Sequence, residues 1–180
     1  MSFEISCVLT LMQSPDMSDI RRRIVNPYGD RFPDDDSIKE VRLQADGQRR
    51  ADPAEDRHVC IRWTNGVLEQ GGTQALCTQI IHLTGGPGTY AFHTPQVKLQ
   101  SEVSQETNTF YSLGRFNRAQ RDRILVLARN VSFDPKSRVN CCRVWMHDLL
   151  EAMLNDGLIQ KALFDYLVAD VPLKKRVPEM

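Results

Sequence analysis

Short runs that alternate apolar or β-branched residues with polar ones occupy the first two thirds of the chain, a pattern typical of β-strands. Gly, Pro and Asn residues between the runs favour turns. The pattern predicts strands over residues 3–12, Lys39–Gln44, His58–Trp63, 75–83, Thr89–His93, Val97–Val103 and Thr109–Tyr111. Asn65-Gly66 is expected to form a hairpin turn, and residues 85–88 to close the strand over 75–83. Such short strands indicate an antiparallel sheet.

From Phe116 onward the apolar spacing becomes helical. One helix carries its apolar face on Ile124, Leu125, Leu127 and Ala128, away from the arginines at positions 115, 118, 121 and 123, and ends before Pro135. A second helix is predicted over Val139–Leu154, with Asn140 as its N-cap and Gly157 beyond its end. A third is predicted over Leu158–Val168, followed by a frayed tail over residues 173–180.

These elements predict an α+β fold in which a small antiparallel sheet packs against C-terminal helices. The length of 180 residues fits a single domain. We expect an N-terminal extension over residues 1–55 and a core over about 57–170.

Composition narrows the class of function. The 23 Lys and Arg residues balance 23 Asp and Glu residues, so no net charge attracts nucleic acid or anionic lipid. The Arg21–Arg23 run reads as a solvated surface, and neither it nor the arginine-bearing helix has interleaved aromatic residues on which bases would stack. The N-terminus lacks a basic signal-peptide start, and no apolar window is long enough to cross a bilayer. We therefore expect a cytoplasmic protein that acts on a small-molecule or peptide substrate.

The five cysteines are odd in number and show no Cys-x-x-Cys spacing, so neither a disulfide framework nor a metal or cofactor site is predicted. Cys141 and Cys142 fall in the first turn of the second helix. The partial positive charge of a helix N-terminus favours a thiolate there and suits a nucleophile. Burial of both thiols as small apolar residues is the alternative.

A nucleophilic thiol needs a base, and two histidines are candidates. His58 opens one predicted strand and His82 lies near the end of the next. Antiparallel neighbours bring the start of one strand beside the end of the other, so the two imidazoles are expected at one edge of the sheet. His147 lies on the cysteine helix itself, five or six residues past the thiols, and is poorly placed as a base.

Three segments resemble a known family: His58-Val-Cys-Ile with Gly66, Ile80-Ile-His-Leu-Thr-Gly-Gly-Pro, and Asn140-Cys-Cys-Arg-Val-Trp. Together they look like the circularly permuted papain-like group typified by lecithin–retinol acyltransferase and its phospholipid-acyltransferase relatives. The resemblance covers about residues 57–154. It implies a permuted papain-like fold with a cysteine nucleophile, with His58 as general base and His82 orienting it.

Two choices within this site stay open at the sequence level. Cys142 is preferred as the nucleophile because it shares a helical face with Trp145, yet Cys141 directly follows Asn140 as in the family motif. His93 is the alternative to His82.

The resulting hypothesis is a cysteine-dependent hydrolase or acyltransferase. It would act on an amide, ester or thioester through a covalent thioacyl intermediate. The alternatives are a non-catalytic ligand- or protein-binding module on the same scaffold, and a zinc site built from His58, His82 and Cys142.

Overall fold

The structure is a computed structural model that describes residues 26, 28–47, 57–70, 72–93 and 96–179. The predicted strand over residues 3–12 and the Arg21–Arg23 run lie outside the described residues, as do residues 48–56.

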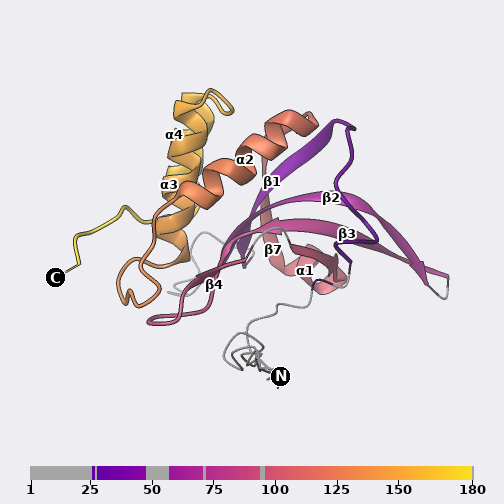
Figure 1. The fold of residues 1–180 in the computed structure, drawn as a ribbon, viewed down its shortest axis with the longest axis horizontal. Helices are drawn as coiled ribbons and strands as arrows, with labels where there is room; N and C mark the ends of the chain where they lie inside the picture. Colours follow the sequence, from indigo (N-terminus) through magenta and orange to yellow (C-terminus); the bar gives the residue numbers. More distant parts are fainter. Residues whose placement is uncertain (1–25, 27, 48–56, 71, 94–95, 180) are drawn as a thin grey trace, which may run out of the picture.

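Five antiparallel strands form the main sheet, in the order β6-β3-β2-β1-β7. Their bounds are Lys39–Asp46 for β1, Val59–Gln70 for β2, Thr73–Ile81 for β3, Gln96–Gln100 for β6 and Asn108–Phe116 for β7. A separate two-stranded pair joins β4 (Leu83–Thr84) to β5 (Ala91–Phe92). The helices are α1 (Glu102–Thr107), α2 (Arg118–Asn130), α3 (Cys142–Asn155) and α4 (Lys161–Asp170). Helices α2, α3 and α4 gather on one side of the strands, and α1 lies apart from them (Figure 1). The expected α+β class and antiparallel sheet are therefore confirmed.

The core lies between the sheet and these C-terminal helices. Alternate residues of the central strands, including Leu43 of β1 and Ile61 of β2, are fully buried in it. Helix α3 contributes to this core the fully or almost fully buried side chains of Trp145, Met146, Leu149, Leu150 and Met153. Burying one such side chain contributes about 1.5–3 kcal/mol, so this helix is fixed firmly against the strands.

The predicted turn at Asn65-Gly66 is wrong. Strand β2 continues through both residues to Gln70, and the pairing with β3 shifts register between Thr64 and Gly66, as in a β-bulge. The Asn65 amide donates to the Phe32 carbonyl oxygen at 3.0 Å, and a Cβ on Gly66 would come within 2.7 Å of the Phe32 ring. The Asn-Gly pair therefore makes room for Phe32, in the loop before β1, and does not form a turn.

Other boundaries also differ from the prediction. The strand expected over Thr89–His93 is only Ala91–Phe92, because the Thr89 and Tyr90 amides bond to the Gly86 and Pro135 carbonyls. The run Val97–Val103 ends early, because the Ser101 hydroxyl accepts from the Ser104 amide and caps α1.

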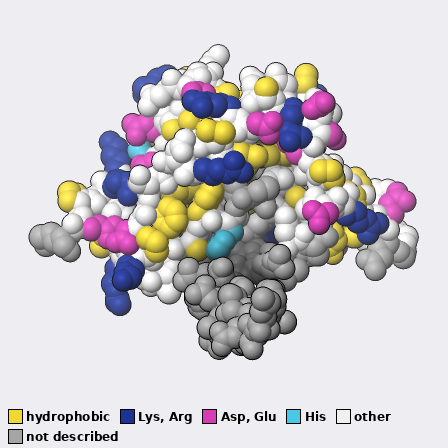
Figure 2. Space-filling view, viewed as in Figure 1, with side chains coloured by type: hydrophobic (Ala, Val, Ile, Leu, Met, Phe, Trp, Pro, Cys, Tyr) yellow, Lys and Arg dark blue, Asp and Glu magenta, His cyan; other side chains and the backbone are white. Residues whose placement is uncertain are grey.

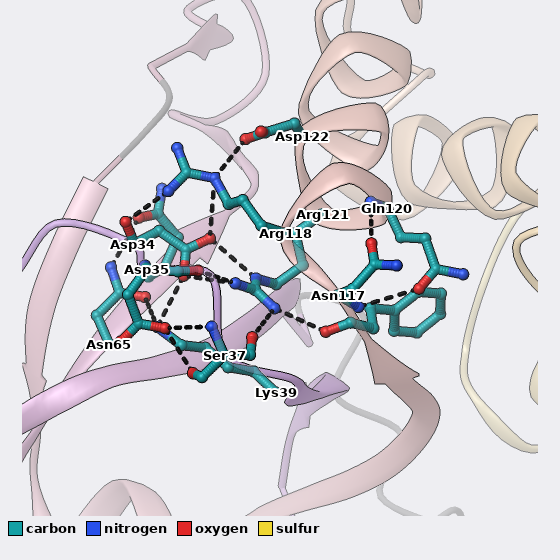
Figure 3. A network of polar contacts seen from close by, with 12 residues as sticks. Asp34, Asp35, Ser37, Lys39, Asn65, Asn117, Arg118, Gln120, Arg121 and Asp122 are labelled. Atoms are coloured by element: carbon teal, nitrogen blue, oxygen red, sulfur yellow. Dashed lines mark hydrogen bonds and ion pairs between the residues drawn. The ribbon is translucent and has the colours of Figure 1, made fainter.

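A buried arginine fastens α2 to the loop before β1. Arg121 is fully buried and donates to both carboxylate oxygens of Asp34 and to the Ser37 and Phe116 carbonyls (Figure 3). Lys39 reaches the same carboxylate at 2.7 Å. The sequence pattern places Arg121 off the apolar face of its helix, yet the side chain is buried and its charge is matched inside the protein.

The expected N-cap of α3 is also wrong by one residue. Cys141, with φ −89° and ψ −175°, occupies the N-cap position. The Asn140 side chain instead holds the C-terminal tail: its amide nitrogen donates to the Val177 carbonyl at 2.9 Å, and its oxygen accepts from the Val177 amide at 3.0 Å. The tail, expected to be frayed, is thus attached beside the start of α3.

Candidate active site

The two predicted histidines meet. The His58 Nε2 atom lies 2.7 Å from His82 Nδ1, a hydrogen bond, and the rings meet edge to face at 4.9 Å between centroids. The strand register explains this contact. Ile61 pairs with Ile81, so one residue further His82 lies opposite Cys60, and His58 is its diagonal neighbour on the same face. His82, rather than His93, is the partner of His58.

Gln96, which the sequence analysis missed, extends this pair. It opens β6 opposite Ile80 and is 3% exposed. The His82 Nε2 atom and both side-chain amide atoms of Gln96 are buried without a well-formed hydrogen bond. A Gln in a predicted strand carries no catalytic signal. Only the register between β3 and β6, which the sequence pattern does not predict, would have identified Gln96.

Burial keeps both imidazoles neutral near pH 7. Desolvation lowers the pKa of His58 below its ordinary 6.5; the Lys98 charge adds to this effect and the Asp46 charge opposes it. Desolvation, followed by the nearby His58 and Lys98, lowers the pKa of His82 to about 4, while Gln96 acts in the opposite direction. A neutral His58 is able to accept a proton.

The two thiols at the start of α3 shift each other's pKa in opposite directions. The pKa of Cys141 is lowered from 9.0, first by the Cys142 thiol and then, against desolvation, by the Arg143 and Val144 amides and the Arg143 side chain. The pKa of Cys142 is raised, first by Cys141 and then by its deeper burial. Two adjacent thiols cannot both ionise, and the amides of the helix N-terminus favour the anion at Cys141.

The start of α3 reaches the first residue of β2, which directly follows His58. The Val59 amide, one residue beyond His58, acts on the Cys142 thiol as a hydrogen-bond donor and lowers its pKa. No hydrogen bond between described residues joins either thiol directly to His58 or His82. The contact is therefore one with the backbone next to His58. The His58 and His82 side chains alternate with the core residues Val59 and Ile81, so they point to the sheet face opposite the one against which the thiols pack.

The other candidate residues lie elsewhere. His147 is buried on α3 against Phe164, with ring centroids 5.7 Å apart. Among the cavities lined by described residues, one of about 320 Å³ lies over the sheet and includes Arg62 and Phe110. Another of about 320 Å³ lies between α2 and α3 and includes Asp148 and Arg176.

Comparison with protein-family models, curated proteins and solved structures gave no match. In the part of the chain that the structure describes, no helix is both long enough and apolar enough to cross a membrane. Basic and acidic side chains are interspersed over the visible face in Figure 2, as the balanced composition leads one to expect.

Proposed function

We propose that the protein is a cysteine-dependent hydrolase or acyltransferase that forms a thioacyl intermediate. The hydrogen bond of 2.7 Å between His58 and His82, one residue before the Val59 amide that acts on the Cys142 thiol, is the observation that supports the proposal. A base whose second nitrogen is bonded to an orienting group is the arrangement that activates nucleophiles and acyl acceptors.

Cys141 is the proposed nucleophile, in place of the Cys142 that the sequence pattern favours. A thiolate attacks and a thiol does not, and the Cys142 thiol, followed by Arg143 and the first-turn amides, lowers the pKa of Cys141. The Cys141 thiolate attacks the carbonyl carbon of the substrate, and the resulting oxyanion is stabilised by N–H groups of the first turn, which an α-helix leaves without intrahelical partners. Collapse of this intermediate breaks the bond to the leaving group and leaves an acyl group on the sulfur.

His58 then acts as the base of the second step. In the tautomer in which His58 Nε2 donates to His82 Nδ1, the basic nitrogen of His58 is Nδ1. It takes a proton from water or from an acceptor alcohol or amine as that molecule attacks the thioester, and the Cys141 thiolate departs. His82 fixes the tautomer of His58, and Gln96 is the proposed partner of His82 on its far side.

This protonation state favours esters and thioesters over amides. An amide needs a proton donor for its amine leaving group, whereas a phenolate or a thiolate leaves without one. His58 is neutral near pH 7 and the attacking thiol has already lost its proton, so no acid is poised for the first step.

The test compares a p-nitrophenyl ester with the matching p-nitroanilide on the purified, reduced protein. We expect turnover of the ester, much less of the anilide, and loss of turnover in Cys141→Ser. Cys142→Ser, the matched control, keeps a substantial fraction. Absence of ester turnover, or full turnover in Cys141→Ser, contradicts the proposal.

A ligand-binding function without chemistry is the second candidate, and the cavity over the sheet favours it. Arg62 is 5% exposed there and lies over the Phe110 ring at 5.5 Å. A guanidinium over an aromatic ring is suited to bind a planar or anionic ligand. This function predicts that Cys141 labels with iodoacetamide only after denaturation.

A further inference from the structure

We propose that α3 carries a binding site for a divalent transition-metal ion such as Zn²⁺, formed by His147, Asp148 and Glu151. One donor atom of each of the three side chains lies within 4.8 Å of the other two. This site is separate from the thiols and from His58 and His82, so it does not depend on the proposed function.

The helical spacing brings the three donors together. His147 and Glu151 are four residues apart and Asp148 and Glu151 are three apart, so all three side chains lie on one patch of the helix surface. An imidazole nitrogen with two carboxylates is a donor set that Zn²⁺ accepts, and such three-residue sites leave a fourth position for water.

The imidazole is already oriented into the patch. The side chain of His147 is 9% exposed, and its Nδ1 atom is buried without a hydrogen-bond partner. That atom faces Asp148 Oδ1 at 3.5 Å, close to the separation of two donors bound to one ion. The Phe164 ring packs edge-on against His147 and restrains it. A buried nitrogen without a partner costs free energy, and a bound cation would satisfy it.

The charges around the patch also favour a cation. Asp148 and Glu151 contribute two negative charges, and Arg176 offsets one of them by binding Asp148 Oδ2 at 2.7 Å. Asp148 Oδ1 remains turned toward His147, and Glu151 is exposed, which lets its carboxylate close on an ion. The arrangement therefore combines a buried donor on His147, a half-buried donor on Asp148 and an exposed donor on Glu151.

The experiment is a Zn²⁺ titration in competition with a chromophoric chelator. It uses the full chain with Cys141→Ser and Cys142→Ser, which removes the other thiophilic site. We expect one Zn²⁺ per chain with micromolar affinity, and Co²⁺ binding without a sulfur-to-cobalt charge-transfer band.

Glu151→Gln should weaken Zn²⁺ binding at least about tenfold, and His147→Gln should abolish it. Glu102→Gln makes the same change of charge at an exposed position on α1 and should leave the affinity unchanged. Because Glu151 is exposed, its variant is expected to fold even if His147→Gln does not. Absence of Zn²⁺ binding, or equal affinity in Glu151→Gln and Glu102→Gln, would overturn the proposal.

Discussion

Arg121 binds both carboxylate oxygens of Asp34, at 2.9 and 3.1 Å, across 87 residues of sequence (Figure 3). Although burial alone would raise the pKa of Asp34, hydrogen bonds from Arg121 and Lys39 hold it below 3.8. The pair joins α2 to the loop that leads into β1.

Arg121→Ala should therefore destabilise the protein by about 3–5 kcal/mol, because it leaves a largely buried carboxylate without its main partner. Arg123→Ala is the matched control on the same helix. Arg123 binds Asp156 at 2.6 Å with its side chain 48% exposed, and its loss should cost under about 1 kcal/mol. Urea unfolding followed by the fluorescence of the two buried tryptophans measures both, and similar costs would contradict the role given to Arg121.

The pKa of His82 predicts a pH dependence of stability. Its folded pKa of about 4 lies below the ordinary 6.5, so between these values the unfolded chain binds the proton more readily. Neutral His82 makes its full contribution to the free energy of unfolding above pH 6.5. This contribution falls by on the order of 3 kcal/mol as the pH decreases to 4.

His82→Gln should reduce the pH dependence of the free energy of unfolding between pH 6.5 and 4, whatever it does to stability at neutral pH. His93→Gln, a histidine outside the bonded pair, should retain the slope. Denaturant titrations at a series of pH values decide this. An unchanged slope in His82→Gln would mean that His82 titrates normally.

The turn after His82 depends on one glycine. Gly85 has φ +87°, and a Cβ there would lie 2.2 Å from the Thr89 carbonyl oxygen. Gly85→Ala should cost about 1–3 kcal/mol. Gly86→Ala meets no atom within 4 Å and should be nearly neutral. Thermal unfolding of the two variants compares them, and equal melting temperatures would refute the requirement for glycine at position 85.

The thiolate at the start of α3 predicts selective alkylation. Cys141 should react with iodoacetamide at pH 6–7, well below the ordinary thiol pKa of 9.0. Cys60 and Cys77, which are 4% and 0% exposed, should stay unlabelled in the folded protein. Peptide mapping after timed quenching identifies each site. Labelling of Cys142 in preference to Cys141 would mean that Cys142, and not Cys141, is the thiolate.

The sequence predicted the elements better than their boundaries. The helical spacing of Ile124 and Ala128 and the alternation along β1 are local signals, and the corresponding elements are confirmed. The Asn65-Gly66 turn was wrong because the outcome depended on Phe32, a residue 33 positions away from Asn65. The burial of Arg121, which lies off the apolar face of α2, was missed for a similar reason, because helical periodicity does not show its partner Asp34.

The same difference between local signals and long-range contacts applies to the candidate site. Antiparallel pairing alone was enough to bring His58 and His82 together, because strand ends meet wherever neighbouring strands pair. Gln96 could not be found, since its role depends on the β3–β6 register. The choice between Cys141 and Cys142 depended on where α3 begins, and helix boundaries are uncertain by a residue or two in any sequence pattern.

The most direct measurement is the lifetime of an acyl group on Cys141, followed by intact-protein and peptide mass spectrometry after mixing with the p-nitrophenyl ester. In His58→Gln the acyl-enzyme should still form but persist about a hundredfold longer than in the unaltered protein, because the base of the second step is missing. His93→Gln should leave the lifetime unchanged. If no acyl group forms on Cys141, or if its lifetime is the same with and without His58, the thiol and the histidine pair do not act together.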